Sequence, residues 1–482
     1  TCALPIFESD DAFFWKLVGE DARRFEARFK QRFADKLPDW EQVFWLAEAL
    51  PQGFEWKQEF INTFYYSWAL WRELRDDPSS ILTLARNPYM LRMLLDVYIQ
   101  FKGVLPSNRG QLFAQFVDVL LQREKLAEID DDTKAVTLSD EGQALLTGLR
   151  QVAFEMQVQR AGRTRDGESS AGTALANERV REILNDRLLY LAVSTSILTM
   201  GDEVRFTHQL LQEYFAAQYI DTEIQAGRLQ ATDIWKPESW WERTNWEEAL
   251  ILLAGLYSND CTRIVDWVNA ANPEVAALCV TRSGAKLPDA TRERLRAEWI
   301  PRLTDVQNEP QAQARAAVGR ALGLTNWDNR KGVGVKPSPL APLPEGEGKR
   351  GRGLRGEGIL LPDIDWVTIP AGEFIYQDGE KLTLPTFEIS RYPVTYVQFQ
   401  TFIDDAEGFY DARWWQGLAL PEGHNNAPGD QRFKYWNHPR ERVSWYDAIA
   451  FCRWLSHKLW TVGTSDGMSE RTAKRPSLPD YD

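Results

Sequence analysis

Two short runs of alternating apolar and polar residues lie close together near the middle of the chain. The runs Ile197–Met200 and Val204–Thr207 predict two strands, and the polar residues 201–203 between them predict a tight turn. A helical pattern with spacing i, i+4, i+8 follows, at Leu211, Phe215 and Tyr219. The pattern predicts a hairpin followed by a helix, with His208 at the junction between strand and helix.

Helical spacing also dominates the chain before this hairpin. Asn87-Pro88 predicts a helix that begins at Pro88, because proline is tolerated in the first turn of a helix but not in its interior. The predicted core-facing positions of this helix are Leu91, Leu94, Leu95 and Tyr98. Ser107 or Asn108 is expected to cap the next helix. Residues 1–75 are rich in aromatic and charged residues and are interpreted as mostly helical.

Residues 226–325 continue the helical pattern as pairs of helices joined by short polar turns. Such pairs resemble HEAT-type units of α-solenoids, which serve more often as packing scaffolds or partner surfaces than as catalytic sites. Residues 326–361 then form the clearest boundary in the chain. Their density of glycine and proline cannot bury a core, so they predict a flexible linker.

The pattern changes to short strands after the linker. Strand character appears at Trp366–Phe374, broken by a Pro-Ala-Gly turn, and at Phe387–Ser390. Thr395 and Ser444 are the expected N-caps of two later helices.

The composition narrows the possible functions. A formal net charge of −14 argues against general nucleic-acid binding, because phosphate contacts need a basic surface. The four cysteines form no CxxC pair, which fits a reducing cytoplasm. The longest apolar run, Ala249–Tyr257, is too short to span a bilayer. We therefore expect a cytoplasmic protein that binds neither nucleic acid nor membrane.

Two stretches of the helical region resemble one family. LARNPYMLRMLLDVYIQFKGVLPSNRGQLFAQFVDVLL resembles the first helical subdomain of NACHT-type signal-transduction ATPases, and FTHQLLQEYFAA resembles the winged-helix end of the same family. The resemblance implies that Asn87 and Pro88 lie near the adenine of a nucleotide and that His208 contacts its phosphates. The alternatives are a helix-start proline without a ligand and a hydrogen-bonded histidine at a strand–helix junction, and the residues themselves leave both open.

The phosphate-binding parts of that family are missing from this sequence. ATP binding there needs a GxxxxGK[ST] loop and an acidic strand that holds the metal. The only Gly-Lys pair, Gly348-Lys349, is followed by arginine in the low-complexity stretch. We expect this chain alone to bind ATP poorly and not to hydrolyse it, with the ATPase core either upstream of Thr1 or lost.

A second resemblance covers the C-terminal region. The motifs IPAGEF, FEISRYPVTYVQFQTFI, YDARWW and NHPRERVSWYDAIAFCRWLS resemble, in this order, the formylglycine-generating enzyme, or sulfatase-modifying factor, family. The resemblance implies an α+β domain of C-type-lectin-like fold and, in active members, oxidation of a substrate cysteine with O2 and a copper ion held by two cysteines. This region has one cysteine, Cys452, which is interpreted as a buried structural thiol, so we expect no metal site and no catalytic residue here.

The predicted fold is multidomain, with α-helical parts, a winged helix and HEAT-like helices, followed by an incomplete α+β lectin-like domain. The predicted boundaries, in chain order, are 1–75, 76–135, 136–225, 226–325, 326–361 and 362–482. The favoured function is a regulatory or signalling protein of the NACHT class, with protein partners at the helical scaffold and lectin-like domain. A longer parent is expected to bind ATP or ADP and to form a nucleotide-dependent oligomer. The alternatives are an oxidase of the formylglycine-generating family and a non-functional fragment of either.

Overall fold

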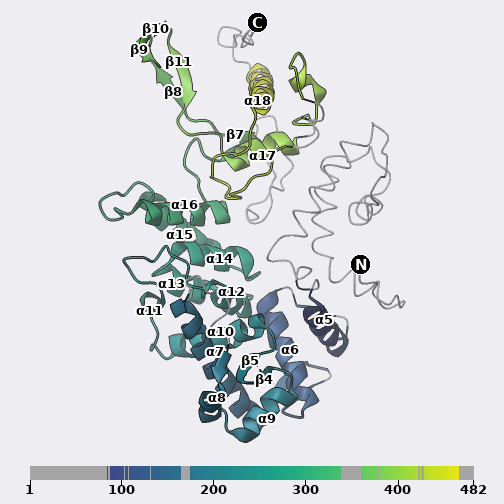
Figure 1. Ribbon diagram of the computed structural model, residues 1–482. Helices are drawn as coiled ribbons and strands as arrows, with labels where there is room; N and C mark the ends of the chain where they lie inside the picture. The colour runs from purple at the N-terminus through teal and green to yellow at the C-terminus, as the bar shows by residue number, and fades with distance from the viewer. Residues whose placement is uncertain are drawn as a thin grey trace. The chain divides into compact units, whose positions relative to one another are not determined.

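The computed structural model describes residues 84, 87–102, 104–106, 108–130, 132–163, 174–337, 360–377, 379–405, 407–421, 424 and 428–465. These residues separate into two compact units, a helical unit of residues 84–321 and a C-terminal unit of residues 322–465 (Figure 1). The prediction of helices in residues 1–75 lies outside the described residues. So does most of the linker predicted for residues 326–361.

The helical unit contains seventeen described elements, of which the last helix continues past residue 321. In chain order they are α5 (Pro88–Gln100), α6 (Arg109–Arg123), β1 (Ala127–Ile129), β2 (Val136–Leu138), α7 (Asp140–Arg163), β3 (Ala174–Ala176), α8 (Asn177–Ile183), α9 (Asp186–Ser194), β4 (Leu198–Met200), β5 (Glu203–Phe206), α10 (Gln209–Gln225), α11 (Ala231–Ile234), α12 (Glu247–Leu256), α13 (Thr262–Asn269), α14 (Pro273–Arg282), α15 (Asp289–Arg302) and α16 (Ala312–Thr325).

The first described helices confirm the predicted starts and correct one predicted face. Asn87 caps α5 with Pro88 in its first turn, and Asn108 caps α6. The buried positions of α5 are Met90, Met93, Leu94 and Val97, so the predicted face of Leu91, Leu94, Leu95 and Tyr98 is wrong except at Leu94. Both sets follow helical spacing, and the choice between them depends on which side of α5 contacts α6.

The predicted hairpin and helix around His208 are confirmed. β4 and β5 pair antiparallel, with Leu198 opposite Phe206, and β3 pairs on the other side of β5 to give the strand order β3-β5-β4. The following helix, α10, packs on α7 and α12 and buries most of its first three turns. A helix enclosed on two sides needs apolar residues around most of its circumference, which explains why Tyr214 and Phe215 are both buried.

Helices α12 to α16 complete the helical unit. Every residue from Ala249 to Gly255 in α12 is buried, because this helix lies against α6, α10 and α14. Its contact with α6 brings two backbones together: a Cβ atom at Gly110 would lie 2.5 Å from the carbonyl oxygen of Leu252. In the described parts of the chain, no helix has the length and apolar character needed to cross a membrane.

The C-terminal unit combines short strands with two helices. Its described elements are β6 (Val335–Pro337), β7 (Leu360–Pro362), β8 (Trp366–Ile369), β9 (Gly372–Tyr376), β10 (Glu380–Leu384), β11 (Phe387–Ser390), α17 (Tyr396–Asp404), the 3-10 helix η2 (Ala412–Trp415) and α18 (Trp445–Ser465). The predicted strands and both predicted caps, Thr395 and Ser444, are confirmed.

Strands β8 to β11 form one long hairpin. Trp366 pairs with Ser390 and Tyr376 with Glu380, so both halves share a single register, with β9 and β10 at the tip (Figure 1). The apolar side chains of this hairpin are unusually exposed: Ile375 is 70% and Ile389 51% accessible. A two-stranded hairpin is marginal by itself, and these strands bury little apolar area within the described residues.

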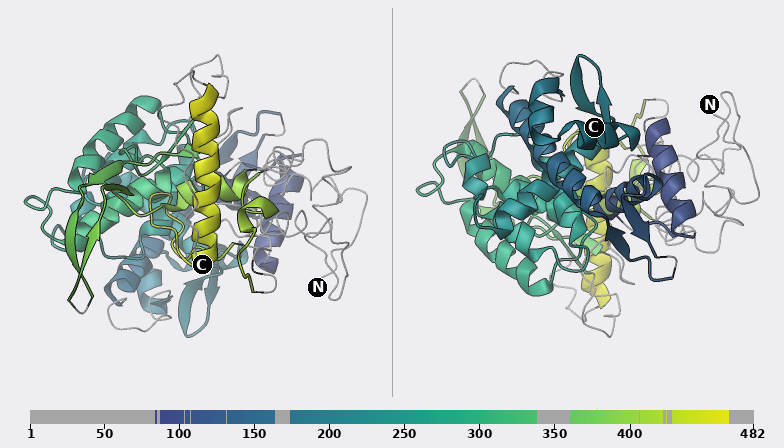
Figure 2. Two further views of the ribbon diagram at one scale, coloured as in Figure 1. Left: turned by 90° about the horizontal axis from the view of Figure 1, so that it is seen from above. Right: turned by 90° about the horizontal axis from the view of Figure 1, so that it is seen from below.

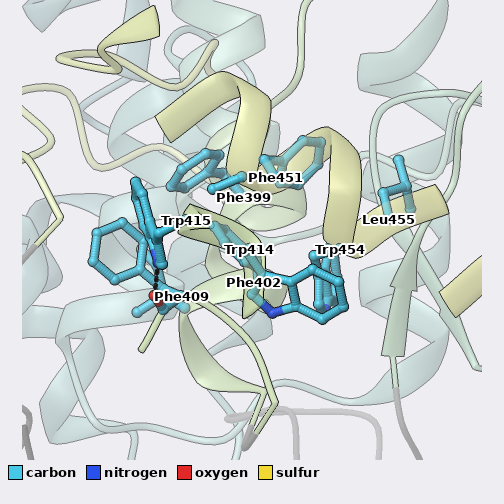
Figure 3. Close-up of a cluster of buried hydrophobic side chains, with 10 residues drawn as sticks. Phe399, Phe402, Phe409, Trp414, Trp415, Phe451, Trp454 and Leu455 are labelled. Carbon is cyan, nitrogen blue, oxygen red and sulfur yellow. Dashed lines mark hydrogen bonds between the residues drawn. The ribbon is translucent and has the colours of Figure 1, made fainter. Parts of the chain in front are cut away.

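The core of the C-terminal unit is an aromatic cluster between α17, η2 and α18 (Figure 3). Phe402, Phe409 and Trp454 are fully buried, and Trp415 donates its indole N–H to the carbonyl oxygen of Phe409 at 2.8 Å. The left view of Figure 2 shows α18 as one uninterrupted helix. The cluster satisfies the indole groups while it removes large apolar surfaces from water.

Residues 328–337 differ from the predicted linker. Val335–Pro337 pairs with Leu360–Pro362, and Val333 is 3% accessible. This segment therefore packs as part of the C-terminal unit. Its composition resembles that of a linker because its contacts are made by backbone atoms, by charged side chains and by the single apolar residue Val333, rather than by a row of apolar side chains.

Candidate functional site

His208 is the N-cap of α10. Its backbone is extended, with φ −143° and ψ 142°, and its Nδ1 accepts a hydrogen bond from the backbone N–H of Leu210 at 3.1 Å. Because Nδ1 is the acceptor, the neutral ring carries its proton on Nε2. Desolvation lowers the pKa of His208 below its ordinary value. The cap and the burial therefore both favour the neutral imidazole with Nε2 as a donor.

The ring of Tyr89 lies parallel to the imidazole of His208. The two ring centroids are 6.0 Å apart and the planes differ by 4°. Tyr89 directly follows Asn87-Pro88, and the Asn87 side chain accepts hydrogen bonds from Tyr89 N at 2.9 Å and Met90 N at 3.4 Å. The fold thus brings the start of α5 beside the start of α10, although the sequence separates them by the length of a small domain.

This arrangement offers a limited set of groups to a ligand. The Asn87 amide oxygen is already used as a helix cap, and Asn87 and Pro88 are both exposed. The Tyr89 hydroxyl is buried without a hydrogen-bond partner among the described residues, and desolvation raises the pKa of Tyr89 to about 12. Capping roles for Asn87 and His208 are observed directly, and nucleotide contact at Asn87, Pro88 and His208 stays a prediction.

A second group of polar residues lies at the start of α18. Ser444 and Asp447 form a capping box, in which Ser444 N donates to Asp447 Oδ2 at 2.8 Å and Asp447 N donates to Ser444 Oγ at 3.1 Å. His424 Nε2 lies 2.9 Å from Ser444 Oγ and 3.5 Å from Asp447 Oδ1. The residue types are those of a nucleophilic triad, but a triad uses both ring nitrogens, one toward serine and one toward the acid. Here a single nitrogen makes both contacts, so the group is a helix cap.

The contact of His424 with the start of α18 is not indicated by the sequence. Its neighbours in space come from the η2 region and from α18, since its ring meets those of Trp415 and Tyr446 edge-on at 6.1 and 5.4 Å. No local pattern indicates such a contact, because the residues are separated in the sequence and have no fixed spacing.

Cys452 is exposed, so its interpretation as a buried thiol is wrong. The inward positions of α18 are Ala450, Phe451, Trp454 and Leu455, which follow the spacing i, i+1, i+4, i+5. Cys452 falls outside this face, although its sequence neighbours are apolar. Among the residues that the structure describes, no group of three or more His, Cys, Asp or Glu side chains is arranged to hold a metal ion.

The residues of the C-terminal region do not match a two-cysteine copper site. Copper(I) is held by soft thiolate ligands, and residues 362–482 contain the single thiol of Cys452 on an open helix face. We therefore derive no chemical step through copper in this chain.

Comparison with known proteins identifies the C-terminal region. Residues 362–469 match the sulfatase-modifying factor enzyme 1-like domain family, so this region carries a domain of that kind, as its motifs predict. The family match does not extend to the helical unit. The resemblance of that unit to NACHT ATPases stays a prediction.

Three curated relatives show the extent of the similarity. The hercynine oxygenase of Mycolicibacterium smegmatis is 28% identical over 141 residues, with 25% of this chain and 32% of that protein covered. The formylglycine-generating enzyme of Mus musculus is 24% identical over 213 residues, with 35% and 57% covered. The enzyme of the same name from Bos taurus is 26% identical over 160 residues, with 24% and 43% covered. The chain thus spans 32% to 57% of these relatives. No solved structure matches it.

Proposed function

We propose that this chain belongs to a regulatory or signalling protein of the NACHT ATPase class. In this proposal the helical unit responds to nucleotide in a longer parent, and the sulfatase-modifying-factor-like domain recognises a ligand or acts as an effector without turnover. The partners are proteins, bound at the helical scaffold or the lectin-like domain, and the compartment is the cytoplasm. ATP or ADP is the parent's cofactor, and nucleotide controls its oligomeric state.

The contact between Tyr89 and His208 is the observation that carries the proposal. The resemblance places Asn87-Pro88 and His208 near one nucleotide, and in the structure their neighbourhoods meet through two parallel rings with centroids 6.0 Å apart. The Nε2–H of a neutral histidine is also a suitable donor to a phosphate oxygen.

The order of elements around this contact gives further support. Helix α7 is followed by β3, two short helices, and then β4 and β5, and the sheet order is β3-β5-β4. A long helix, two short helices and a three-stranded antiparallel sheet are the parts expected of a winged helix. Fold-level likeness does not establish an activity, so the proposal depends on a direct test.

The test is nucleotide binding by the full-length parent. The DNA upstream of the codon for Thr1 is sequenced first, and an in-frame GxxxxGK[ST] motif is expected there. In the parent, His208→Ala is expected to weaken ADP binding about tenfold in titration calorimetry, since a hydrogen bond to a charged group contributes roughly 1.5–3 kcal/mol. His438→Ala, in the C-terminal unit, is the control and should leave the affinity unchanged. An unchanged affinity in His208→Ala, or an upstream frame without the motif, would contradict the proposal.

An oxidase function is the second candidate, because relatives of the C-terminal domain are named formylglycine-generating enzyme and hercynine oxygenase. The chain is incubated with copper(I), O2 and a cysteine-containing peptide, and aldehyde formation is followed by mass spectrometry. We expect no aldehyde, because this region offers one thiol where active members of the family use two. Aldehyde formation that is lost in Cys452→Ser would favour the oxidase instead.

A further inference from the structure

Residues 328–337, which we call the strap, lie against the C-terminal domain as a turn at residues 331–334 followed by the short strand β6. The strap pairs antiparallel with β7, where Val335, Lys336 and Pro337 are opposite Pro362, Leu361 and Leu360. The backbone N–H of Asp363 donates to the Gly334 carbonyl oxygen at 3.0 Å. The strap precedes the matched family region, which begins at residue 362. The strap and the matched region are joined in the chain through residues 338–359.

One fully buried side chain holds the strap by its backbone. Gln398, in α17, has no accessible surface. Its Nε2 lies 3.2 Å from the Gly332 oxygen, 3.1 Å from the Gly334 oxygen and 2.6 Å from the Asp363 oxygen. Its Oε1 accepts from the backbone N–H of Thr395 at 3.0 Å. An amide this deeply buried has no access to water, so without the strap two of these acceptors would be missing and the amide would lose hydrogen bonds.

Thr395 contacts the carbonyl group of Val333, which lies between those of Gly332 and Gly334. Its hydroxyl donates to the Val333 oxygen at 2.7 Å and accepts from Gln398 N at 3.4 Å, so the N-cap residue of α17 serves the helix and the strap together. Three successive carbonyl oxygens of the strap, those of residues 332, 333 and 334, thus face Thr395 and Gln398. Such contacts depend on the conformation of the bound backbone and not on the identity of its side chains.

The carboxylate of Asp363 and a glycine fix the other side of the strap. Asp363 accepts from Gly332 N at 3.0 Å and from Lys336 Nζ at 3.2 Å. Gly332 has φ +86°, and a Cβ atom there would lie 2.7 Å from Cβ of Asp365. Gly334 differs, because its added Cβ would meet nothing closer than 3.7 Å. The chain can therefore follow this path only with glycine at 332, while position 334 tolerates a side chain.

We propose that Thr395, Gln398 and Asp363 form a binding site for a peptide backbone that makes a turn and continues as a strand, and that its occupant is the strap of the same chain. The site selects a segment that presents three successive carbonyl oxygens, has glycine at the turn, and carries a lysine that reaches Asp363. The C-terminal domain therefore holds a peptide bound in cis, and the strap makes the domain sensitive to the segment that precedes it. This inference is independent of the nucleotide proposal, since none of these residues takes part in it.

The first experiment compares two glycine substitutions in the complete chain. Gly332→Ala is expected to release the strap, so peptides that cover residues 328–337 should exchange backbone hydrogen for deuterium roughly tenfold faster than in the unmodified protein. Gly334→Ala is the matched control and should leave exchange unchanged. Equal exchange in both variants would overturn the proposal, because the site would then not depend on the path of the strap.

The second experiment tests binding in trans. A fluorescent synthetic peptide with the sequence of residues 327–338 is titrated into the Gly332→Ala chain and into the unmodified chain, and anisotropy is measured. We expect saturable binding to the variant, whose site is vacated, and at least tenfold weaker binding to the unmodified chain, whose site is occupied. Adding Gln398→Leu to Gly332→Ala should abolish binding, while adding Gln400→Leu should not, because the Gln400 amide contacts Asp404 on the same helix. Failure of the peptide to bind the Gly332→Ala chain, or equal binding with and without Gln398, would refute the site.

Discussion

Asp118 in the helical unit and Asp328 in the C-terminal unit are both withdrawn from water, yet their pKa values move in opposite directions. Desolvation raises the pKa of Asp118 to about 6, and among the described residues no cation offsets this effect. Desolvation also acts on Asp328, but hydrogen bonds from Arg330 and Asn437 and the charge of Arg330 outweigh it, so its pKa is lowered. Arg330 contacts both oxygens of Asp328, at 2.9 and 2.8 Å.

The difference shows that burial by itself does not determine what a carboxyl group contributes to stability. The charged form of Asp118 is disfavoured, so its contribution is greatest at low pH and is lost as the pH rises from 3.8 to about 6. The contribution of Asp328 depends on pH in the opposite way. Because its pKa is lowered in the folded protein, its charge stabilises the fold at pH values above 3.8, and this stabilisation is lost as the pH falls below 3.8. The two units should therefore respond differently to acid.

The largest effect tests whether the units have separate cores. Trp299 in the helical unit and Trp454 in the C-terminal unit are both fully buried, and each donates its indole N–H to a polar side chain, Asn269 at 2.7 Å and Asp405 at 2.9 Å. Trp299→Ala and Trp454→Ala should each lower the free energy of unfolding by about 3–5 kcal/mol. Denaturant unfolding, followed by hydrogen exchange in each unit, measures this. If either substitution lowered the stability of both units equally, the two units would not have separate cores.

Asp118→Asn is expected to stabilise the helical unit at neutral and alkaline pH. The shift from 3.8 to about 6 corresponds to at most about 3 kcal/mol of destabilisation once Asp118 is ionised, and the neutral amide avoids this cost. Thermal unfolding at pH 8 and at pH 4 should show a gain only at the higher pH. Exposed Asp132 provides the control, and Asp132→Asn should show no such dependence. A loss of stability at pH 8 in Asp118→Asn would reverse the assignment.

Asp328→Asn should act in the opposite sense. It removes the charge that Arg330 pairs with, and it leaves a guanidinium half-buried without its carboxylate. The C-terminal unit should lose about 2 kcal/mol at pH 7 and less at pH 3, because the carboxylate of the unfolded chain, with its ordinary pKa of 3.8, is then largely protonated and less of the contribution of the charge remains. Urea unfolding at the two pH values measures the difference, with Glu380→Gln on the hairpin as the control. A loss of equal size at both values would show that the charge of Asp328 is not responsible.

The smallest expected effect concerns the hairpin of β8–β11. Ile375 is 70% accessible, so Ile375→Ser should change the free energy of unfolding by less than about 0.5 kcal/mol. Urea unfolding of Ile375→Ser and Trp454→Ala under the same conditions compares the loss of stability at the hairpin with the loss in the aromatic core. A loss above about 1.5 kcal/mol would show that Ile375 is covered in solution.

The predicted elements came from local signals, and most of these signals were sufficient. Pro88, Thr395 and Ser444 mark helix starts through contacts within one turn, so the sequence predicts them without knowledge of the rest of the fold. The hairpin before His208 follows from alternation over a few residues. The C-terminal family was identified from short motifs in the expected order, and comparison confirms it.

The missed features all depend on a partner outside the helix or segment that contains them. The face of α5 depends on its contact with α6, and exposed Cys452 depends on which side of α18 meets the aromatic cluster. The strap was predicted as a linker because its stabilising contacts come from backbone carbonyl oxygens and the buried amide of Gln398. Composition records side chains, so it cannot indicate contacts of this kind.

The sequence by itself determined where helices and strands begin, which family the C-terminal domain resembles, and that no GxxxxGK[ST] loop is present, because each of these is written in adjacent residues. Only the tertiary structure decided that Tyr89 meets His208, that His424 contacts the cap of α18, and that the strap fills the site of Gln398. These contacts join residues that are separated by tens of positions in the sequence. Local sequence preferences do not favour them over other possible contacts, so they are decided by how the helices and strands pack.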